Sequence, residues 1–245
     1  MNKIYIEGHR GACALYPENT LLSFGKAMKM GVDAVEFDVR LTADKVPVLM
    51  HDGNAFRTCG ADRDLRDMTL KELKTLCPSA PKAFGDRYIG QVEVPTLYEL
   101  LKLREQLRPD LKLGVEIKEY TEETVDITVK ALKEYGVFEA CWFYAFNGRI
   151  LRYIKETYNG RTMGYPDFQM QEFDGYDAYD EIGLSMAIAR SEVADVYMKK
   201  GLPVHMYCAD TREDVQFCIE KGASLITANN PTALLCAIKP SAGTL

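Results

Sequence analysis

The chain has 245 residues, enough for one large domain or two small ones. Hydrophobic residues make up 47% and charged residues 27%, as in an ordinary globular protein, and no apolar run approaches the length of a membrane span. The net charge of -6 argues against a nucleic-acid-binding surface, which is usually basic.

Strand-like and helix-like segments alternate along almost the whole chain. The predicted strands are residues 3–9, 33–39, 112–118, 141–146, 161–165, 181–187, 202–208 and 223–229. The predicted helices are residues 19–30, 95–107, 122–135, 148–158, 192–199 and 213–221. Such alternation indicates a parallel sheet, and eight strands predict an α/β fold of the (β/α)8 TIM barrel type. We expect a single domain over residues 1–245.

The N-terminus enters the first predicted strand directly, without the pattern of a signal peptide. The chain has seven cysteines, an odd number at irregular spacing, and no C-x-x-C motif. These features favour reduced thiols that are mostly buried, and they predict a cytoplasmic protein. The oligomeric state cannot be read from the sequence.

A long segment, about residues 40–95, separates the second predicted strand from its crossover helix at residues 95–107. It begins with the apolar run PVLMHD, residues 47–52, which follows too closely to be the next parallel strand. We therefore expect a hairpin that turns around Ala43, Asp44 and Lys45, and an insertion after the second strand. In a barrel of this class, such an insertion lies at the active-site face.

This hairpin brings chemically active side chains together. Asp38 lies six residues before Asp44 and His51 lies seven after it, so the hairpin should return His51 alongside Asp38. The period of two in a strand puts Glu36 and Asp38 on the same face. Two neighbouring carboxylates repel each other and need a cation or a shared proton. The alternative is a pair of hydrated acids on an exposed strand edge.

Two more strand ends favour a functional site over an exposed edge. The first strand ends in His9 and Arg10, and the third barrel strand ends in Glu116 and Lys118. In a barrel these side chains meet those of the second strand at the carboxyl-terminal face.

The ordered set of motifs resembles the glycerophosphodiester phosphodiesterases. The motifs are HRG at His9, PENT at residues 17–20, the block from Gly31 through Glu36-x-Asp38 to His51-Asp52, Arg57-Thr58, residues 95–97 and Glu116-x-Lys118. The resemblance covers nearly the whole chain and implies a barrel with an insertion after the second strand. It implies a metal site formed by Glu36, Asp38 and Glu116. It also implies an acid/base pair, His9 and His51, and phosphate contacts from Arg10 and Lys118.

The residue types fit that chemistry. Three carboxylates without a thiolate select one hard divalent cation, Mg²⁺ or Ca²⁺. Two histidines can take a proton from the attacking oxygen and give one to the leaving alcohol near neutral pH. The resemblance implies that the substrate's own glycerol 2-hydroxyl attacks, giving a cyclic phosphate that water opens. The sequence does not show which histidine is the base.

Several positions depart from the family or have simpler explanations. Residues 207–210, Tyr-Cys-Ala-Asp, replace the family's Trp-Thr-Val-Asn, Ala145-Phe146 replaces Ser-Phe, and the usual Asp near Asn229 is missing. We expect Tyr207 to line the substrate pocket as an aromatic wall. His205 is more readily a core residue than a ligand.

Glu18 and Asn19 belong to the PENT motif, and Asp52 follows His51. For each of them we compare a local structural role with support of a site residue. Asn19 or Thr20 can cap the helix that follows, and capping alone is enough to explain Asn19. Glu18 can support Arg10, and Asp52 can orient His51 or only favour a turn.

Two other functions compete with a phosphodiesterase for small, water-soluble glycerophosphodiesters. A lysophospholipase D-like enzyme would need an apolar groove or membrane-facing patch, and the insertion contains no strongly amphipathic basic helix. A barrel kept only for binding would lack at least one metal or histidine position, and none is missing. We therefore expect a small-molecule substrate, no nucleic acid and no stable membrane insertion.

Overall fold

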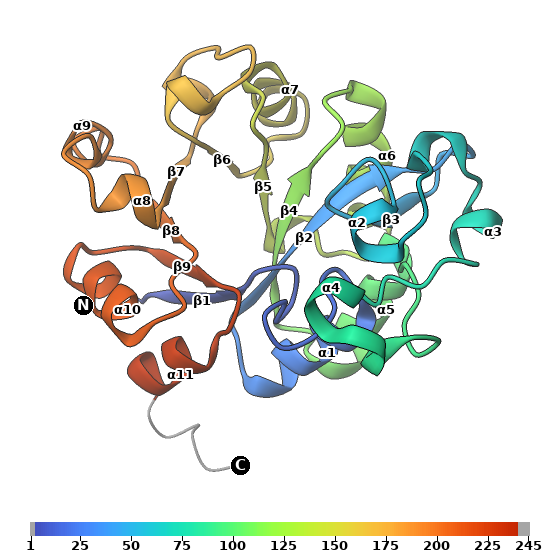
Figure 1. Cartoon of the computed structure of the whole chain (residues 1–245). Coiled ribbons are helices and arrows are strands. Elements are labelled where there is room, and N and C mark those ends of the chain that lie inside the picture. The colour runs from blue at the N-terminus through green and yellow to red at the C-terminus, as the bar shows by residue number, and fades with distance from the viewer. Residues whose placement is uncertain (1–2, 240–245) are drawn as a thin grey trace.

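The computed structural model describes residues 3–239, and its centre is a closed parallel barrel. The strands of the barrel are β1 (Tyr5–Gly8), β2 (Ala34–Leu41), β4 (Lys112–Ile117), β5 (Cys141–Tyr144), β6 (Thr162–Gly164), β7 (Glu181–Ser185), β8 (Val204–Tyr207) and β9 (Leu225–Ala228). The ring closes because β1 pairs in parallel with both β2 and β9. Figure 1 shows the strands as a ring with helices around its outside. The predicted TIM barrel is confirmed.

The longer helices lie between successive strands. They are α1 (Leu21–Met30), α5 (Leu97–Leu107), α6 (Glu122–Glu134), α7 (Gly148–Tyr158) and α10 (Arg212–Glu220). Each begins where a side-chain oxygen accepts a hydrogen bond from the third helical N–H, and the capping residues are Thr20, Thr96, Thr121, Asn147 and Thr211. Shorter helices are α8 (Met186–Ala189), α9 (Ala194–Met198) and α11 (Thr232–Ile238).

Two details differ from the sequence prediction, and a third agrees with it. The strand β7, predicted over residues 181–187, stops at Ser185, because Ser185 caps α8 and commits Met186 and Ala187 to a helix. The last helix, α11, was not expected. The connection from β6 to β7 contains only two short 3-10 turns, Asp167–Gln169 and Tyr176–Ala178, in agreement with its weak helical period.

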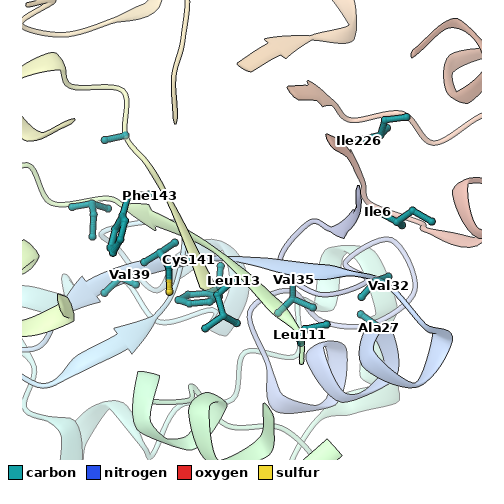
Figure 2. Close-up of a cluster of buried hydrophobic side chains, with 14 of the residues drawn as sticks. Ile6, Ala27, Val32, Val35, Val39, Leu111, Leu113, Cys141, Phe143 and Ile226 are labelled. Atoms are coloured by element: carbon teal, nitrogen blue, oxygen red, sulfur yellow. The ribbon is translucent and has the colours of Figure 1, made fainter. Parts of the chain in front are cut away.

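The main hydrophobic core lies between the barrel and its helices. Figure 2 shows Val35 and Val39 of β2, Leu113 of β4 and Phe143 of β5 pointing toward this layer. All four side chains are fully buried. Burial of such apolar area is the principal driving force for folding, so this layer fixes the strands and leaves their carboxyl ends free to carry chemistry.

The predicted hairpin is present. The short strand β3 (Pro47–Leu49) pairs antiparallel with β2, with Val39 opposite Leu49, and the Met50 N–H donates to the Asp38 carbonyl at 3.0 Å. His51 therefore emerges one residue beyond the pairing position that the sequence predicted. The hairpin places it beside Asp38 in the middle of β2.

The rest of the insertion packs beside the barrel mouth around a small hydrophobic cluster that includes Leu65, Met68 and Val94. Its helices are α2 (Phe56–Cys59), α3 (Leu70–Leu73) and α4 (Pro81–Phe84), and its 3-10 turns are Leu65–Asp67 and Gly85–Tyr88. A further 3-10 turn, Phe138–Ala140, precedes β5. Within residues 3–239 no helix is both long and apolar enough to cross a bilayer. The seven cysteines are unpaired, as predicted, but the expectation that most of them are buried was wrong, because only Cys141 and Cys218 are.

Candidate active site

The predicted site residues meet at the carboxyl-terminal end of the barrel. His9 and Arg10 follow β1, Glu36 and Asp38 lie on β2, and His51 follows β3. The other three are Glu116 on β4, Lys118 just after it, and Tyr207 at the end of β8. Apart from Asp38, all of them line one cavity of about 230 Å³. The structure therefore brings together every residue that the sequence assigned to the site.

Three carboxylates form the centre of this cluster. Glu36, Asp38 and Glu116 are 3%, 0% and 7% exposed, and each offers an oxygen within 4.8 Å of the others. Parallel pairing places Asp38 directly beside Glu116. The alternative of hydrated acids on an exposed edge is excluded, because all three side chains are buried.

The surrounding polar groups compensate only part of this negative charge. Nε of Arg10 lies 3.2 Å and Nζ of Lys118 lies 3.3 Å from Asp38, and Lys118 also donates to Glu116 at 2.7 Å. The backbone N–H of Arg10 donates to Oε2 of Glu36 at 2.8 Å. The other oxygen of Glu36, Oε1, is buried and accepts no hydrogen bond from the part of the chain that the structure describes. A buried acceptor of this kind calls for a further partner.

The pKa values reflect this imbalance. Burial and the charges of Asp38 and Glu116 hold the pKa of Glu36 well above its ordinary value. Burial likewise raises the pKa of Glu116 to about 7, despite the nearby Lys118. Burial opposes ionisation of Asp38 too, but Arg10 and Lys118 hold its pKa well below the ordinary value. The cluster therefore has room for additional positive charge.

His9 is oriented by residues that follow β9, the strand next to β1, and β8, the strand beyond it. Its Nδ1 lies 2.6 Å from Oδ1 of Asn229, and the Asn229 amide nitrogen donates to Asp210 at 2.6 Å. Because a carboxylate only accepts, the amide nitrogen faces Asp210 and the amide oxygen faces His9. The proton of neutral His9 is therefore on Nδ1, and Nε2, 3.8 Å from Glu36, carries the free lone pair. Burial and Arg10 lower the pKa of His9 to about 4, which favours the neutral ring.

His51 has a charged partner instead. Its Nδ1 lies 2.7 Å from Oδ1 of Asp52, whose Oδ2 accepts from Arg57 at 2.6 Å. Burial lowers the pKa of His51, while Asp38 and Asp52 oppose that shift. The two imidazoles thus differ in kind, because one ring faces an amide oxygen and the other faces a carboxylate.

Glu18 joins the two sides of the site. It accepts hydrogen bonds from Arg10 at 2.9 Å and from Arg57 at 2.7 and 2.8 Å. The expected support of Arg10 by Glu18 is present, and so is the contact between Asp52 and His51. Both contacts fix the direction of charged groups beside the cavity.

The sequence interpretation missed or misassigned several groups. Asn19 is not the helix cap, because Thr20 has that position; instead Asn19 donates to Asp38 at 2.7 Å. Its position in the PENT motif was the sequence feature that could have indicated this contact. Asn229 and Asp210 had no assigned role, and no local pattern links them to His9, which is far away in sequence.

A second, more open cavity of about 560 Å³ adjoins the first. Its lining comes mainly from the insertion and includes Asp52, Asn54, Phe56 and Arg57. His51 and Lys118 line both cavities. The site therefore has a largely buried aromatic side and an open side, with these two residues between them.

Comparison with known proteins agrees with this geometry. The model of the glycerophosphoryl diester phosphodiesterase family matches residues 9–233. A glycerophosphodiester phosphodiesterase of Caldanaerobacter subterraneus subsp. tengcongensis is 28% identical, over 95% of this chain and 97% of that protein. The Bacillus subtilis protein YqiK, which has no described function, is 30% identical over 91% of this chain and 93% of its own length.

Solved structures share the fold. An Oleispira antarctica phosphodiesterase in complex with the product sn-glycerol-3-phosphate has a TM-score of 0.82 and 24% identity, and 96% of each chain is covered. A Thermotoga maritima glycerophosphodiester phosphodiesterase has a TM-score of 0.75 and 22% identity, covering 97% of this chain and 99% of that one. With the family match spanning the barrel and its site, the chain belongs to the glycerophosphoryl diester phosphodiesterase family, a group of phosphoric diester hydrolases.

Proposed function

We propose that this chain hydrolyses glycerophosphodiesters to sn-glycerol 3-phosphate and an alcohol, with one divalent cation, Mg²⁺ or Ca²⁺. The observation that carries the proposal is the meeting of three carboxylates, two histidines and two cationic side chains at one cavity. The product bound to the Oleispira antarctica relative supports the choice of substrate.

The donor set fits a hard cation. Glu36, Asp38 and Glu116 provide only oxygen ligands, and Oε1 of Glu36 is buried without a hydrogen-bond partner within the described residues 3–239. Oxygen ligands suit Mg²⁺ and Ca²⁺ rather than zinc. When bound, such an ion supplies positive charge that stabilises the negative charge developing on the phosphoryl oxygens.

Arg10 and Lys118 border the cavity and contribute further positive charge to the phosphate. The phosphate fits at the junction of the two cavities, where Lys118 and His51 line both. The glyceryl group then occupies the buried side and the alcohol occupies the open side, where many alcohols can be accommodated. Tyr207 forms part of the wall on the glyceryl side.

This placement of the substrate assigns a catalytic role to each histidine. His9 lines only the glyceryl side, and its Nε2 has a free lone pair, so it takes the proton of the glycerol 2-hydroxyl. The hydroxyl oxygen then bonds to phosphorus while the bond from phosphorus to the alcohol oxygen breaks. His51, paired with Asp52, gives its proton to the departing alcohol. Water opens the resulting cyclic phosphate, with the two histidines exchanging roles.

The lipid alternative is less well supported. A lysophospholipid carries an acyl chain on its glyceryl group, and the cavity of about 230 Å³ ends in buried polar residues rather than in an apolar groove. A lysophospholipid assayed beside glycerophosphocholine tests this directly. Faster turnover of the lipid would reverse the assignment.

Replacing either histidine with alanine should lower kcat by roughly 10²–10⁴-fold, the usual effect of losing a positioned acid or base. Because both act in one step, the double variant should lose far less than the product of the two single losses. Steady-state kinetics on glycerophosphocholine provide the measurement. A single variant with near wild-type kcat would remove that histidine from the mechanism.

The leaving group separates the two roles. With glyceryl p-nitrophenyl phosphate, whose phenol leaves without protonation, His51→Ala should recover much of its lost rate. His9→Ala should not recover, because the attacking hydroxyl still needs a base. Recovery in His9→Ala alone would exchange the two assignments.

A further inference from the structure

Inside the barrel, the layer of side chains just below the active site is polar. TIM barrels are normally filled there by branched apolar side chains. Here Glu7 lies two residues before His9, Tyr144 two before Phe146 and His205 two before Tyr207, each on the inward face of its strand. Together with Thr227 of β9, these residues line the same cavity as the catalytic groups. We call Glu7, Tyr144, His205 and Thr227 the cavity floor.

The floor is built around a buried carboxylate. Glu7 is 1% exposed and accepts hydrogen bonds from the hydroxyls of Tyr144 at 2.9 Å and Thr227 at 2.7 Å. A carboxylate accepts about four hydrogen bonds, so Glu7 retains capacity for another donor. Gly114 makes space for this arrangement, because a Cβ there would lie 2.4 Å from Oε1 of Glu7.

His205 adds an unpartnered polar atom. Its Nε2 forms an ion pair with Glu181, but its Nδ1 is buried and has no hydrogen-bond partner among residues 3–239. The side chain is 2% exposed and lines the cavity. The predicted buried location of His205 is confirmed, and its Nδ1 still requires a hydrogen-bonding group from the cavity.

The distance between the cavity floor and the catalytic residues at the strand ends suits a short polyol. Two residues of a strand span about 6.6 Å, comparable with an extended three-carbon chain and its end hydroxyl. The walls between are aromatic: Phe146 stacks on Tyr165 with ring centroids 3.7 Å apart, and Tyr165 meets Tyr207 edge to face. Such walls suit the carbon chain, and the floor suits the hydroxyl.

We propose that the cavity floor binds the terminal hydroxyl of the substrate's glyceryl group, with Glu7 as acceptor and His205 Nδ1 as second partner. This subsite rests on the proposed function and extends it, because it makes a free terminal hydroxyl a condition of good substrates. An acyl or alkyl substituent on that oxygen would remove the donor and clash with the closed floor. Selectivity for deacylated diesters then arises inside the barrel.

The test compares glycerophosphocholine with its terminal-deoxy analogue, which keeps the 2-hydroxyl but ends in a methyl group. The wild-type protein should show a kcat/KM lower by roughly 10²-fold for the analogue, because losing the hydroxyl leaves buried polar groups without their hydrogen-bond partner. Calorimetry should show the same preference for sn-glycerol 3-phosphate over 1,2-propanediol 1-phosphate. Calorimetry does not depend on turnover.

Variants show which residues discriminate between the hydroxylated ligand and its deoxy analogue. Glu7→Gln and Thr227→Val should each reduce the preference for the hydroxylated ligand, mainly by weakening glycerophosphocholine while leaving the analogue almost unchanged. Thr128→Val is the matched control, since Thr128 is also a fully buried threonine but lies on α6, away from the cavity. It should keep the wild-type preference. Thermal unfolding and circular dichroism show whether each variant is folded.

Equal kcat/KM and equal affinity for both members of each pair in the wild-type protein would overturn the subsite, whatever the variants do. A wild-type preference that Glu7→Gln and Thr227→Val both retain would overturn the assignment to the floor. No turnover of either diester, with tighter binding of sn-glycerol 3-phosphate, would instead refute the proposed function and support the subsite.

Discussion

Removing divalent cations should reduce turnover of glycerophosphocholine to background, and either Mg²⁺ or Ca²⁺ should restore it. The expected loss is large because Glu36, Asp38 and Glu116 form a buried, negatively charged cluster beside the phosphate position. Without a cation, this cluster repels the anionic substrate instead of stabilising it. The measurement is kcat/KM in excess chelator, followed by titration with each metal.

Variants connect the metal to these carboxylates. Glu36→Gln should reduce metal affinity strongly, since it removes a charge and leaves the unpaired oxygen a weaker ligand. Glu105→Gln, on the exposed face of α5, is the control and should retain wild-type affinity. Full turnover in excess chelator would rule out a metal role. Normal metal affinity in the Glu36→Gln variant would show that the metal binds elsewhere.

The same cluster predicts how metal binding depends on pH. Burial raises the pKa of Glu116 from 4.5 to about 7, so the metal-free folded protein binds a proton there that the unfolded chain has lost. Stability from this group is present below pH 4.5 and is lost as pH rises through about 7. A cation competes with that proton, so metal affinity should rise over the same window.

Thermal unfolding checks this prediction. The increase in Tm caused by a fixed concentration of Ca²⁺ should grow between pH 5 and pH 8. Over the same range, the contribution of Glu116 to the Tm of the metal-free protein should fall. The Glu36→Gln protein should show little increase at either pH. A metal effect that is constant across this range would contradict a proton-competing carboxylate cluster.

The sequence predicted the parts of the site that strands carry. Period-two alternation placed Glu36 and Asp38 on one face, and parallel topology placed Glu116 beside them. Counting from Asp44 located His51 to within one pairing position. These inferences succeeded because a regular strand converts sequence spacing directly into direction and distance.

Contacts between distant loops could not be predicted in this way. Asn229 and Asp210 orient His9 across the closure of the barrel, where no periodicity relates the three positions. Glu7 is a different case. It lies two residues before His9, so strand alternation puts both side chains on the inward face, but Glu7 had no role assigned from the sequence, because only the cavity shows that this face contains open space.

Replacing the substrate's 2-hydroxyl with hydrogen should nearly stop turnover while leaving binding largely intact. The cyclic route requires that oxygen as nucleophile, and intramolecular attack gains about 7–11 kcal/mol in favourable model reactions. Water attacking in the same site lacks this advantage. The 2-deoxy analogue of glycerophosphocholine should therefore lose kcat by roughly 10³-fold or more. Its dissociation constant should be near normal, since the proposed contacts of Arg10 and Lys118 are to the phosphate alone.

The terminal-deoxy analogue is the matched control, because it lacks one hydroxyl but keeps the nucleophile. It should lose mainly affinity, whereas the 2-deoxy analogue should lose mainly kcat, a separation that simple loss of polarity would not produce. Phosphorus NMR provides a direct view, since the cyclic phosphate should accumulate transiently during turnover of glycerophosphocholine and the synthetic cyclic compound should itself be hydrolysed. Equal kcat for glycerophosphocholine and its 2-deoxy analogue would show that water attacks directly; His9 would then activate water, and the assignment of His51 to the leaving alcohol would stand.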